Sequence, residues 1–241
     1  NTLVPGLQDA TQLRHTLKSG TSSACIQEID ALHCDGRAFP IEIVVSGLSL
    51  EGEELYTAFI RNISERNAHQ AALQHQATHD PLTGLGNRNL LQERLEQLTR
   101  ISCPADKSAA VLMLDLDRFK EINDTLGHHV GDLVLEEVAN RLALAVGDST
   151  TLTRFGGDEF VLVMPDTDAA GAETVARKIV DEVDRLHLVC ADGVQVRASV
   201  GLASRIPEQA QDCPDRYALL QLADDALYKV KDSGGGAVRQ G

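Results

Sequence analysis

The spacing of hydrophobic and polar residues changes several times along the chain, and each change marks a predicted element. Residues 7–19 have helical spacing and end at Gly20, which suits a helix terminus. Three β-type runs follow, separated by Asp-Gly and Glu-Gly pairs that suit tight hairpin turns. The runs cover about 22–32, 39–49 and 54–62. The pattern predicts an antiparallel meander, which is small for a core of its own.

A polar helix is predicted between Ile63 and about Thr78. Its sequence, SERNAHQAALQHQAT, contains no Gly or Pro and has only a thin apolar stripe, and Ser64 suits the N-cap position. A helix of this length spans about 24 Å, enough to hold two domains apart and to pair with a copy of itself. We interpret residues 63–78 as a linker.

Helical and strand patterns alternate from His79 onward. The run at 109–116 is apolar throughout and predicts a strand buried on both faces. Helices are predicted at about 87–99, 130–146, 168–186 and 216–232, and further strands at 150–154, 158–164, 187–191 and 194–203. These elements predict an α/β sandwich with a sheet of about five strands.

Composition and charge narrow the classes of function. The 241 residues include 22 Lys and Arg against 36 Asp and Glu, a net charge of −14, which argues against a nucleic-acid partner. The longest apolar runs are far shorter than the roughly 18 residues of a membrane span, so we expect no direct membrane insertion. Five cysteines without a CxxC pair fit a cytoplasmic protein with no disulfide framework.

Two acidic clusters are candidates for chemistry. Asp115 and Asp117 follow the buried strand, and Asp158-Glu159 follow the Gly156-Gly157 turn. Carboxylates gathered at a sheet edge raise one another's pKa unless a divalent cation lies between them, and oxygen ligands favour Mg²⁺ or Mn²⁺. The clusters therefore indicate metal-assisted phosphoryl transfer on a nucleotide. The alternative is that they only decorate the turns of an acidic protein.

Polar residues next to the first cluster suit a nucleotide. Residues 118–120 open a short helix, where backbone N–H groups and a lysine can hold an anion. Asn123, His128 and Asp132 offer amide, imidazole and carboxylate groups to a purine. The competing interpretation is that Asn123 caps a helix and Gly127 ends one.

Four stretches, in order, resemble one known family. RFGGDEF at 154–160 resembles the signature of the GGDEF family of diguanylate cyclases. Three further stretches agree with it: HDPLTGLGNR at 79–88, DLDRFKEINDTLGHHVGD at 115–132 and ADDALYKVK at 223–231. The resemblance covers 79–241 and implies a nucleotidyl-cyclase or palm-like fold, with a mainly antiparallel central sheet flanked by helices.

The resemblance also implies an activity. Family members join two GTP molecules into cyclic di-GMP and release two pyrophosphates, with one half-site from each subunit of a homodimer. The resemblance assigns Asp158 as the base or metal-bound activator of the ribose 3′-hydroxyl, with Glu159 as its catalytic neighbour. It assigns Mg²⁺ or Mn²⁺ to Asp115, the carbonyl of Leu116, Asp158 and Glu159.

The remaining site residues implied by the resemblance bind substrate. Asn123 and Asp132 would recognise guanine with His128 beside them, and Gly156 and Gly157 would make room for the α-phosphate. Lys120 and the amides around Phe119 would hold the triphosphate and stabilise the transition state, and Lys231 matches a lysine that contacts phosphate.

The chain departs from the family pattern at two places. Gly235 stands where family members usually carry an arginine that assists the lysine at the phosphates, which places GTP affinity or turnover in doubt. The window of the product-inhibition motif RxxD is Gly147-Asp148-Ser149-Thr150, so we expect no inhibition by cyclic di-GMP through that route.

The N-terminal part resembles half of a second family. DGRAFPIEIVVSGL at 35–48 and YTAFIRNISER at 56–66 are similar to the last three strands of a PAS sensor domain and its exit motif. We therefore expect a partial PAS domain at 1–62, a linker at 63–78 and the catalytic domain at 79–241. The partial domain indicates either a piece of a longer sensor protein or a reduced dimerisation cap.

Two alternatives to catalysis remain. In the first, the domain binds GTP without cyclising it and regulates a phosphodiesterase domain beyond Gly241. In the second, it acts as an interaction scaffold. The complete carboxylate set favours catalysis.

Overall fold

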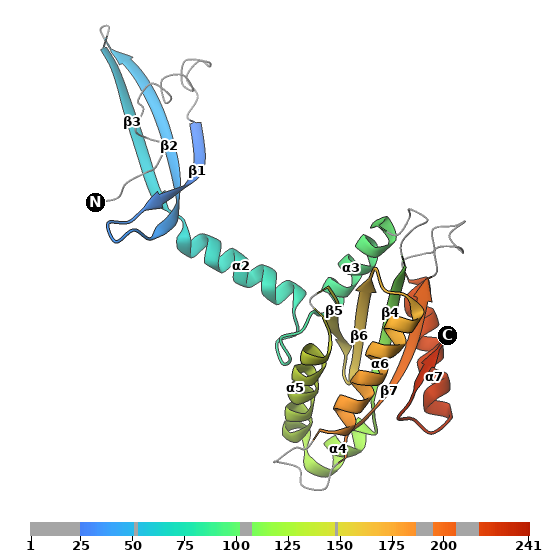
Figure 1. The fold of residues 1–241 in the computed structure, drawn as a ribbon. Coiled ribbons are helices and arrows are strands. Elements are labelled where there is room, and N and C mark those ends of the chain that lie inside the picture. The colour runs from blue at the N-terminus through green and yellow to red at the C-terminus, as the bar shows by residue number, and fades with distance from the viewer. Residues whose placement is uncertain (1–24, 51–52, 102–107, 148, 187–194, 206–216) are drawn as a thin grey trace. The chain divides into compact units, whose positions relative to one another are not determined.

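The computed structural model describes residues 25–50, 53–101, 108–147, 149–186, 195–205 and 217–241 (Figure 1). The chain forms two compact units, Asn1–Gln74 and His75–Gly241. The helix predicted at 7–19 lies outside the described residues. None of the helices in the described ranges has the length and apolar character needed to cross a membrane.

The first unit contains a three-stranded antiparallel sheet in the order β1-β2-β3. Its strands are β1 (Cys25–Leu32), β2 (Ala38–Leu50) and β3 (Glu53–Asn62), which confirms the predicted meander. On β2, Ile41, Ile43 and Val45 are buried, whereas Glu42 and Val44 between them are half-buried. This alternation follows the two-residue period of a strand. The likeness to a PAS domain stays a prediction.

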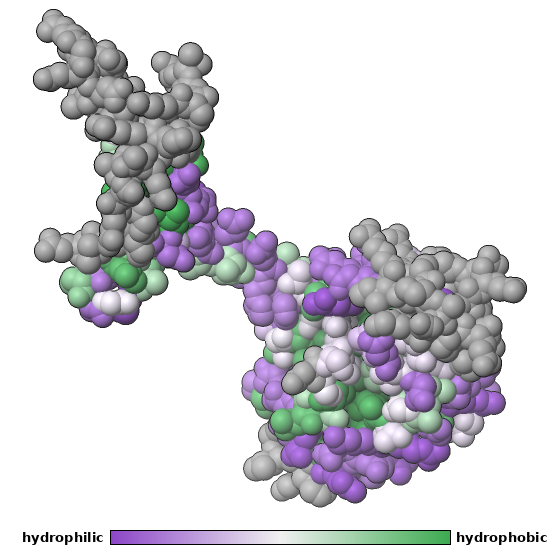
Figure 2. Space-filling view, turned by 45° about the horizontal axis from the view of Figure 1, so that its top comes forward, coloured by the Kyte–Doolittle hydropathy of each residue, from purple (hydrophilic) through white to green (hydrophobic). Residues whose placement is uncertain are grey.

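Helix α2 (Ser64–Thr78) has no buried residue, and its surface is largely hydrophilic (Figure 2). Ser64 is its first helical residue, and the N–H of Ser64 donates to Asn62 Oδ1 at 2.9 Å. Arg66 pairs with Glu28 and, at 3.3 Å, with Glu42. The predicted polar helix is therefore present, and the side chain that accepts at its start comes from Asn62 rather than Ser64.

The second unit contains a five-stranded sheet in the order β5-β6-β4-β7-β8. Its elements are α3 (Arg88–Ile101), β4 (Ala109–Asp117), α4 (Phe119–Leu126), α5 (His128–Ala145), β5 (Thr151–Gly156), β6 (Glu159–Pro165), α6 (Ala169–Asp184), β7 (Arg197–Arg205), α7 (Ala218–Asp232) and β8 (Val238–Gln240). Neighbouring strands pair antiparallel except β8, which pairs parallel with β7. The predicted mainly antiparallel α/β sandwich is confirmed. Its fifth strand is β8, and the strand predicted at 187–191 lies outside the described residues.

Strand β4 is the middle strand of this sheet, and helices cover both of its faces (Figure 1). Ala110, Leu112, Leu114 and Leu116 belong to the core shared with α4, α5 and α6, whereas Val111 and Met113 belong to the core shared with α3 and α7. All residues from Ala109 to Leu116 are buried, as the continuous apolar run predicts. The odd-numbered face continues to Asp115 and Asp117.

Helix α7 approaches β7 at Gly201. A Cβ atom on Gly201 would lie 2.0 Å from the carbonyl oxygen of Ala223 and 2.4 Å from the backbone nitrogen of Leu227. Gly201 pairs with Met113 on β4, and Ser199 pairs with Asp115. Because residues four apart share a helix face, the residue one turn after Leu227, Lys231, lies over the end of β4.

Candidate active site

Three carboxyl groups meet where β4 ends and β6 begins. Asp115 is only 7% exposed and pairs with Glu159 in the β4–β6 register. The N–H of Leu116 donates to the carbonyl of Asp158 at 3.3 Å, so the turn before β6 is fastened to β4. The structure therefore brings Asp115 together with Asp158 and Glu159, which lie far from it in the sequence.

The environment of two of these carboxyl groups, Asp115 and Glu159, favours their protonated forms. Burial raises the pKa of Asp115; the hydrogen bond from Lys231 opposes this increase, and the negative charges of Asp158 and Asp117 add to it. Burial likewise raises the pKa of Glu159, and the charges of Asp115 and Asp158 raise it further. Raised pKa values are expected where several carboxyl groups are gathered in a partly buried place.

Lys231 supplies one cation at this place. Its Nζ lies 2.6 Å from Asp115 Oδ2, and its side chain is 42% exposed. The contact follows from the seating of α7 on Gly201, which directs the last turn of the helix to the end of β4. Lys231 is thus positioned to contact both a carboxylate and an incoming anion.

The donor atoms suit Mg²⁺ or Mn²⁺ bound together with a nucleotide. Carboxylates and backbone carbonyls are hard oxygen ligands. After burial, the negative charges of neighbouring carboxylates also contribute to the raised pKa values of Asp115 and Glu159. Within the described residues, no group of three or more His, Cys, Asp and Glu side chains is placed to hold a metal by itself. Mg²⁺ usually takes one or two protein carboxylates and completes its shell with water and phosphate oxygens, so the residues present fit that mode.

Helices α4 and α5 carry the predicted nucleotide-binding residues. Arg118 adopts a left-handed conformation with φ of 58°, which turns the chain from β4 into α4. Phe119 is buried, whereas Lys120 is exposed. A Cβ atom on Gly131 would lie 2.0 Å from Asn123 Oδ1, so the Asn123 side chain rests directly on α5.

The junction between the two helices confirms that Gly127 ends α4. Gly127 has φ of +86°, and its N–H donates to the carbonyl of Asn123 at 2.9 Å. His128 and Asp132 lie in the first two turns of α5 and are exposed. Asn123 therefore has a backbone role at the helix end and a side chain beside the α5 turn that carries Asp132.

The turn between β5 and β6 is held by two residues that were not among the predicted site residues. Gly156 ends β5, and Gly157 has φ of +48°. Arg154 donates from Nε and Nη2 to the carbonyl of Gly157 at 2.9 and 2.8 Å, and its Nη1 lies 3.1 Å from Asp80 Oδ1. Both residues occur in the motifs at 79–88 and 154–160, but spacing alone does not indicate that they pair.

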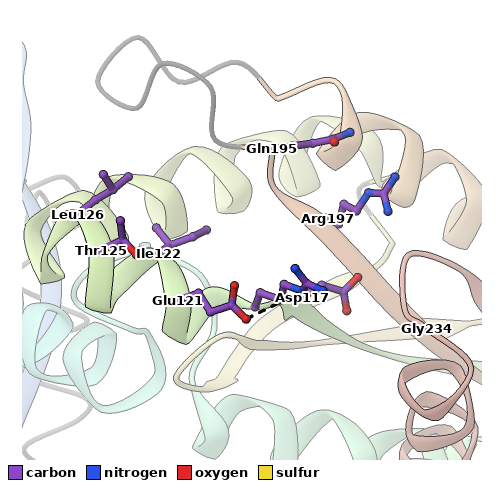
Figure 3. A pocket seen from close by; sticks show the side chains of 9 residues that line it. Asp117, Glu121, Ile122, Thr125, Leu126, Gln195, Arg197 and Gly234 are labelled. Carbon is purple, nitrogen blue, oxygen red and sulfur yellow. Dashed lines mark ion pairs between the residues drawn. The ribbon is translucent and has the colours of Figure 1, made fainter.

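Asp117, grouped with Asp115 in the sequence, has different partners. Its Oδ1 accepts from Ser199 Oγ at 2.7 Å, and its Oδ2 accepts from the N–H of Gly236 at 2.8 Å. A pocket of about 530 Å³ opens beside it, between α4 and the beginning of β7 (Figure 3). Arg118 and Glu121, which both line this pocket, form an ion pair, and Figure 3 marks it with a dashed line at Glu121. A second pocket, of about 340 Å³, borders the Gly156-Gly157 turn.

Comparison with known proteins decides the family. Residues 77–237 match the family described as "Diguanylate cyclase, GGDEF domain". The chain belongs to the GGDEF diguanylate cyclase family. The GGDEF domain therefore accounts for the second unit and not for the sheet of the first.

Curated relatives contain the same domain within longer chains. The bifunctional diguanylate cyclase/cyclic di-GMP phosphodiesterase MucR of Pseudomonas aeruginosa is 39% identical over 194 residues, covering 80% of this chain and 27% of MucR. The response regulator PleD of Caulobacter vibrioides is 37% identical over 186 residues, covering 76% of this chain and 39% of PleD. The chain thus spans less than half the length of these relatives.

Solved structures share the fold of the GGDEF domain. The coiled coil and GGDEF domain of DgcB from Caulobacter crescentus, in complex with c-di-GMP, superimposes with a TM-score of 0.68 at 27% identity, covering 74% of this chain and 93% of that one. Diguanylate cyclase SiaD, in complex with its activator SiaC from Pseudomonas aeruginosa, gives a TM-score of 0.64 at 34% identity, covering 73% of this chain and 66% of SiaD. These likenesses confirm the predicted fold class, and the family match supports the predicted enzyme class of the domain.

Proposed function

We propose that this chain cyclises two GTP molecules into cyclic di-GMP and releases two pyrophosphates. The observation that supports this most directly is the group of Asp115, Asp158 and Glu159, with raised pKa values for Asp115 and Glu159 and with Lys231 facing Asp115. A partly buried acidic cluster beside a lysine at a sheet edge is suited to binding a nucleoside triphosphate with a divalent cation.

The chemical step is an attack by a ribose 3′-hydroxyl on the α-phosphate of the second GTP. The 3′ oxygen forms a bond to phosphorus, the bond between the α-phosphorus and the bridging oxygen breaks, and pyrophosphate leaves. Asp158 accepts the proton of the hydroxyl, and Glu159 lies beside it. Mg²⁺ or Mn²⁺, held by Asp115, the Leu116 carbonyl, Asp158 and Glu159, would lower the pKa of the hydroxyl and offset the phosphate charge.

The remaining residues bind and orient GTP. Asn123 and Asp132 recognise guanine, with His128 beside them, because they lie on adjacent turns of α4 and α5. The phosphates are held by Lys120, the amides around Phe119, and Lys231, and they pass the backbone of Gly156 and Gly157. A homodimer is part of the proposal, because each copy carries one such half-site.

Regulation through the first unit is proposed on the sequence resemblance to a PAS domain. Helix α2 runs from the three-stranded sheet to the His75–Gly241 unit and has no buried residue, which suits a linker that pairs with a second copy. Further sensor or phosphodiesterase domains in a longer chain are consistent with the size of the relatives.

The deciding experiment incubates the purified chain with GTP and Mg²⁺ and measures cyclic di-GMP and pyrophosphate. We expect product from the unaltered chain and a loss of about 10²–10⁴-fold in Asp158→Ala, the usual range for a residue that transfers a proton. Asp181→Ala, at an exposed position on α6, is the matched control and retains activity. Nucleotide binding without product contradicts the proposal and favours an allosteric GTP-binding domain, and absence of binding favours a scaffold.

A further inference from the structure

The two aspartates at the end of β4 face the same side but differ in their partners. Asp115 contacts Lys231, whereas Asp117 uses both carboxylate oxygens inside the protein. Ser199 Oγ donates to Asp117 Oδ1 at 2.7 Å and accepts from the N–H of Gly236 at 3.0 Å; the same N–H also lies 2.8 Å from Asp117 Oδ2. These three groups form a closed hydrogen-bonded ring, which we call the Asp117 anchor.

The segment held by the Asp117 anchor is the exit from α7. The N–H of Gly234 donates to the carbonyl of Lys231, and the N–H of Gly235 donates to the carbonyl of Val230, both at 3.1 Å. Immediately after Gly236, the carbonyl of Ala237 accepts from β7 and β8 begins. The anchor therefore lies between the end of α7 and β8, only five residues after Lys231.

The triple glycine at 234–236 allows this contact. The three residues have φ of +117°, +75° and +65°, a region that residues with a Cβ rarely adopt. A Cβ atom on Gly235 would also lie 2.9 Å from both carboxylate oxygens of Asp117. The segment thus has the backbone freedom and the absence of side chains that a close approach to Asp117 requires.

The end of α7 is consequently tied to β4 at two points. One tie is the ion pair between Lys231 and Asp115, and the other is the Asp117 anchor. When a metal ion takes Asp115, as proposed above, the Nζ of Lys231 gives up this carboxylate and contacts the substrate phosphates alone. The anchor contains no atom of Lys231 or Asp115, so it persists when the first tie opens.

We propose that Asp117 is a positioning residue that acts through Ser199 and Gly236 rather than a metal ligand. It holds the end of α7 at the site, so that Lys231 exchanges its carboxylate partner for substrate phosphate without the helix end moving away. The kinetic part of this proposal rests on the proposed cyclase function, and the structural part does not.

The test compares two small substitutions that remove one partner each. Asp117→Asn keeps the shape but replaces one accepting oxygen by a donor, and Ser199→Ala removes only the hydroxyl. In both variants we expect amide hydrogen exchange in residues 233–241 to increase at least about tenfold, because a partly buried hydrogen bond that holds this segment is lost. The exposed Asp181→Asn on α6 is the control, and its exchange is unchanged.

Kinetics then separates positioning from general loss of structure. We expect kcat to fall by about 10–100-fold in both variants, the range found for groups that orient a functional side chain. KM for GTP stays within about twofold because guanine recognition by α4 and α5 is untouched. The double variant loses no more than the worse single variant, because the two residues act as one unit.

Three results would overturn the proposal. The first is unchanged exchange in both variants. The second is unchanged kcat in variants whose exchange has increased. The third is a raised Mg²⁺ requirement in Asp117→Asn with exchange unchanged, which would make Asp117 a metal ligand. If the unaltered chain makes no cyclic di-GMP, the proposed function fails, and the exchange experiment by itself decides whether the anchor exists.

Discussion

Lys231 Nζ lies 2.6 Å from Asp115 Oδ2, so an ammonium group occupies one side of the carboxylate assigned to a divalent cation. The charge of Lys231 partly offsets the effect of burial on Asp115, whose pKa nonetheless remains raised. A lysine and a metal compete for the same oxygen in this arrangement. We therefore expect Lys231 to pair with this carboxylate until substrate and metal bind, and then to contact the phosphates.

Lys231→Ala separates the two roles of this lysine. We expect cyclic di-GMP formation to fall by about 10²–10³-fold, because a charged donor to the phosphates is removed. In the same variant, Mn²⁺ binding without nucleotide, followed by electron paramagnetic resonance, is at least as tight as in the unaltered chain. Lys229→Ala, exposed in the same turn of α7, is the control for both measurements. Weaker Mn²⁺ binding in Lys231→Ala would contradict the competition.

The Arg154–Asp80 ion pair predicts a pH-dependent contribution to stability. Burial alone would raise the pKa of Asp80, but hydrogen bonds from Thr83 and Arg154 outweigh it and hold the pKa below the ordinary 3.8. A lowered pKa in the folded state stabilises the fold above the ordinary value, and this contribution is lost as pH falls through the lowered value.

Asp80→Asn tests the direction of this pH dependence of stability. We expect it to lower the free energy of unfolding by about 1 kcal/mol at neutral pH, through the lost charged hydrogen bonds. Urea unfolding at a series of pH values measures the difference from the unaltered chain. The difference shrinks as pH falls below about 4 and is constant above about 5. A difference that grows toward acid pH would contradict the assignment, and Asp181→Asn shows the effect of an exposed aspartate.

The sequence predicts the sheet and helix layers of the second unit better than the contacts made by its C-terminal segment. The strand at 109–116 is predictable because burial on both faces leaves an uninterrupted apolar run. Strand β8 is missed because its three residues follow three glycines, and its pairing with β7 depends on where α7 ends. Local periodicity carries no information about such a pairing.

The candidate site likewise contains residues that the sequence predicts and contacts that it does not. Motifs indicate Asp115, Asp158 and Glu159, and the strand register explains why they meet. Two contacts are invisible to sequence spacing, because Arg154 and Asp80 are 74 positions apart and Asp117 and Gly236 are 119 apart. In both contacts, a side chain forms a hydrogen bond with a polar group of a segment that is distant in sequence.

Gly235→Arg introduces the residue that the family pattern has at this position, and we expect it to impair this chain. Gly235 has φ of +75°, where a residue with a Cβ is strained by about 1–2 kcal/mol, and its Cβ would lie 2.9 Å from both Asp117 oxygens. Cyclic di-GMP formation falls at least about tenfold, and thermal unfolding occurs at a lower temperature. Gly235→Ala, which adds the Cβ without the charge, shows the same direction. A gain in kcat/KM with the arginine would show that the segment rearranges freely.

Gly201→Ala tests whether the close packing of α7 on Gly201 determines the position of Lys231 at the site. The new Cβ would lie 2.0 Å from the Ala223 carbonyl and 2.4 Å from the Leu227 nitrogen, and backbone atoms cannot rotate away as a side chain can. We expect the helix to shift and the free energy of unfolding to fall by about 1–3 kcal/mol. Gly147→Ala is the matched control, because nothing lies within 4 Å of its Cβ. Lys231 lies one turn beyond Leu227, so a shift of the helix also moves Lys231. We therefore expect cyclic di-GMP formation, measured at a temperature at which the variant is folded, to fall by more than its loss of stability explains. Full activity in a folded Gly201→Ala variant would show that Lys231 does not depend on this seating.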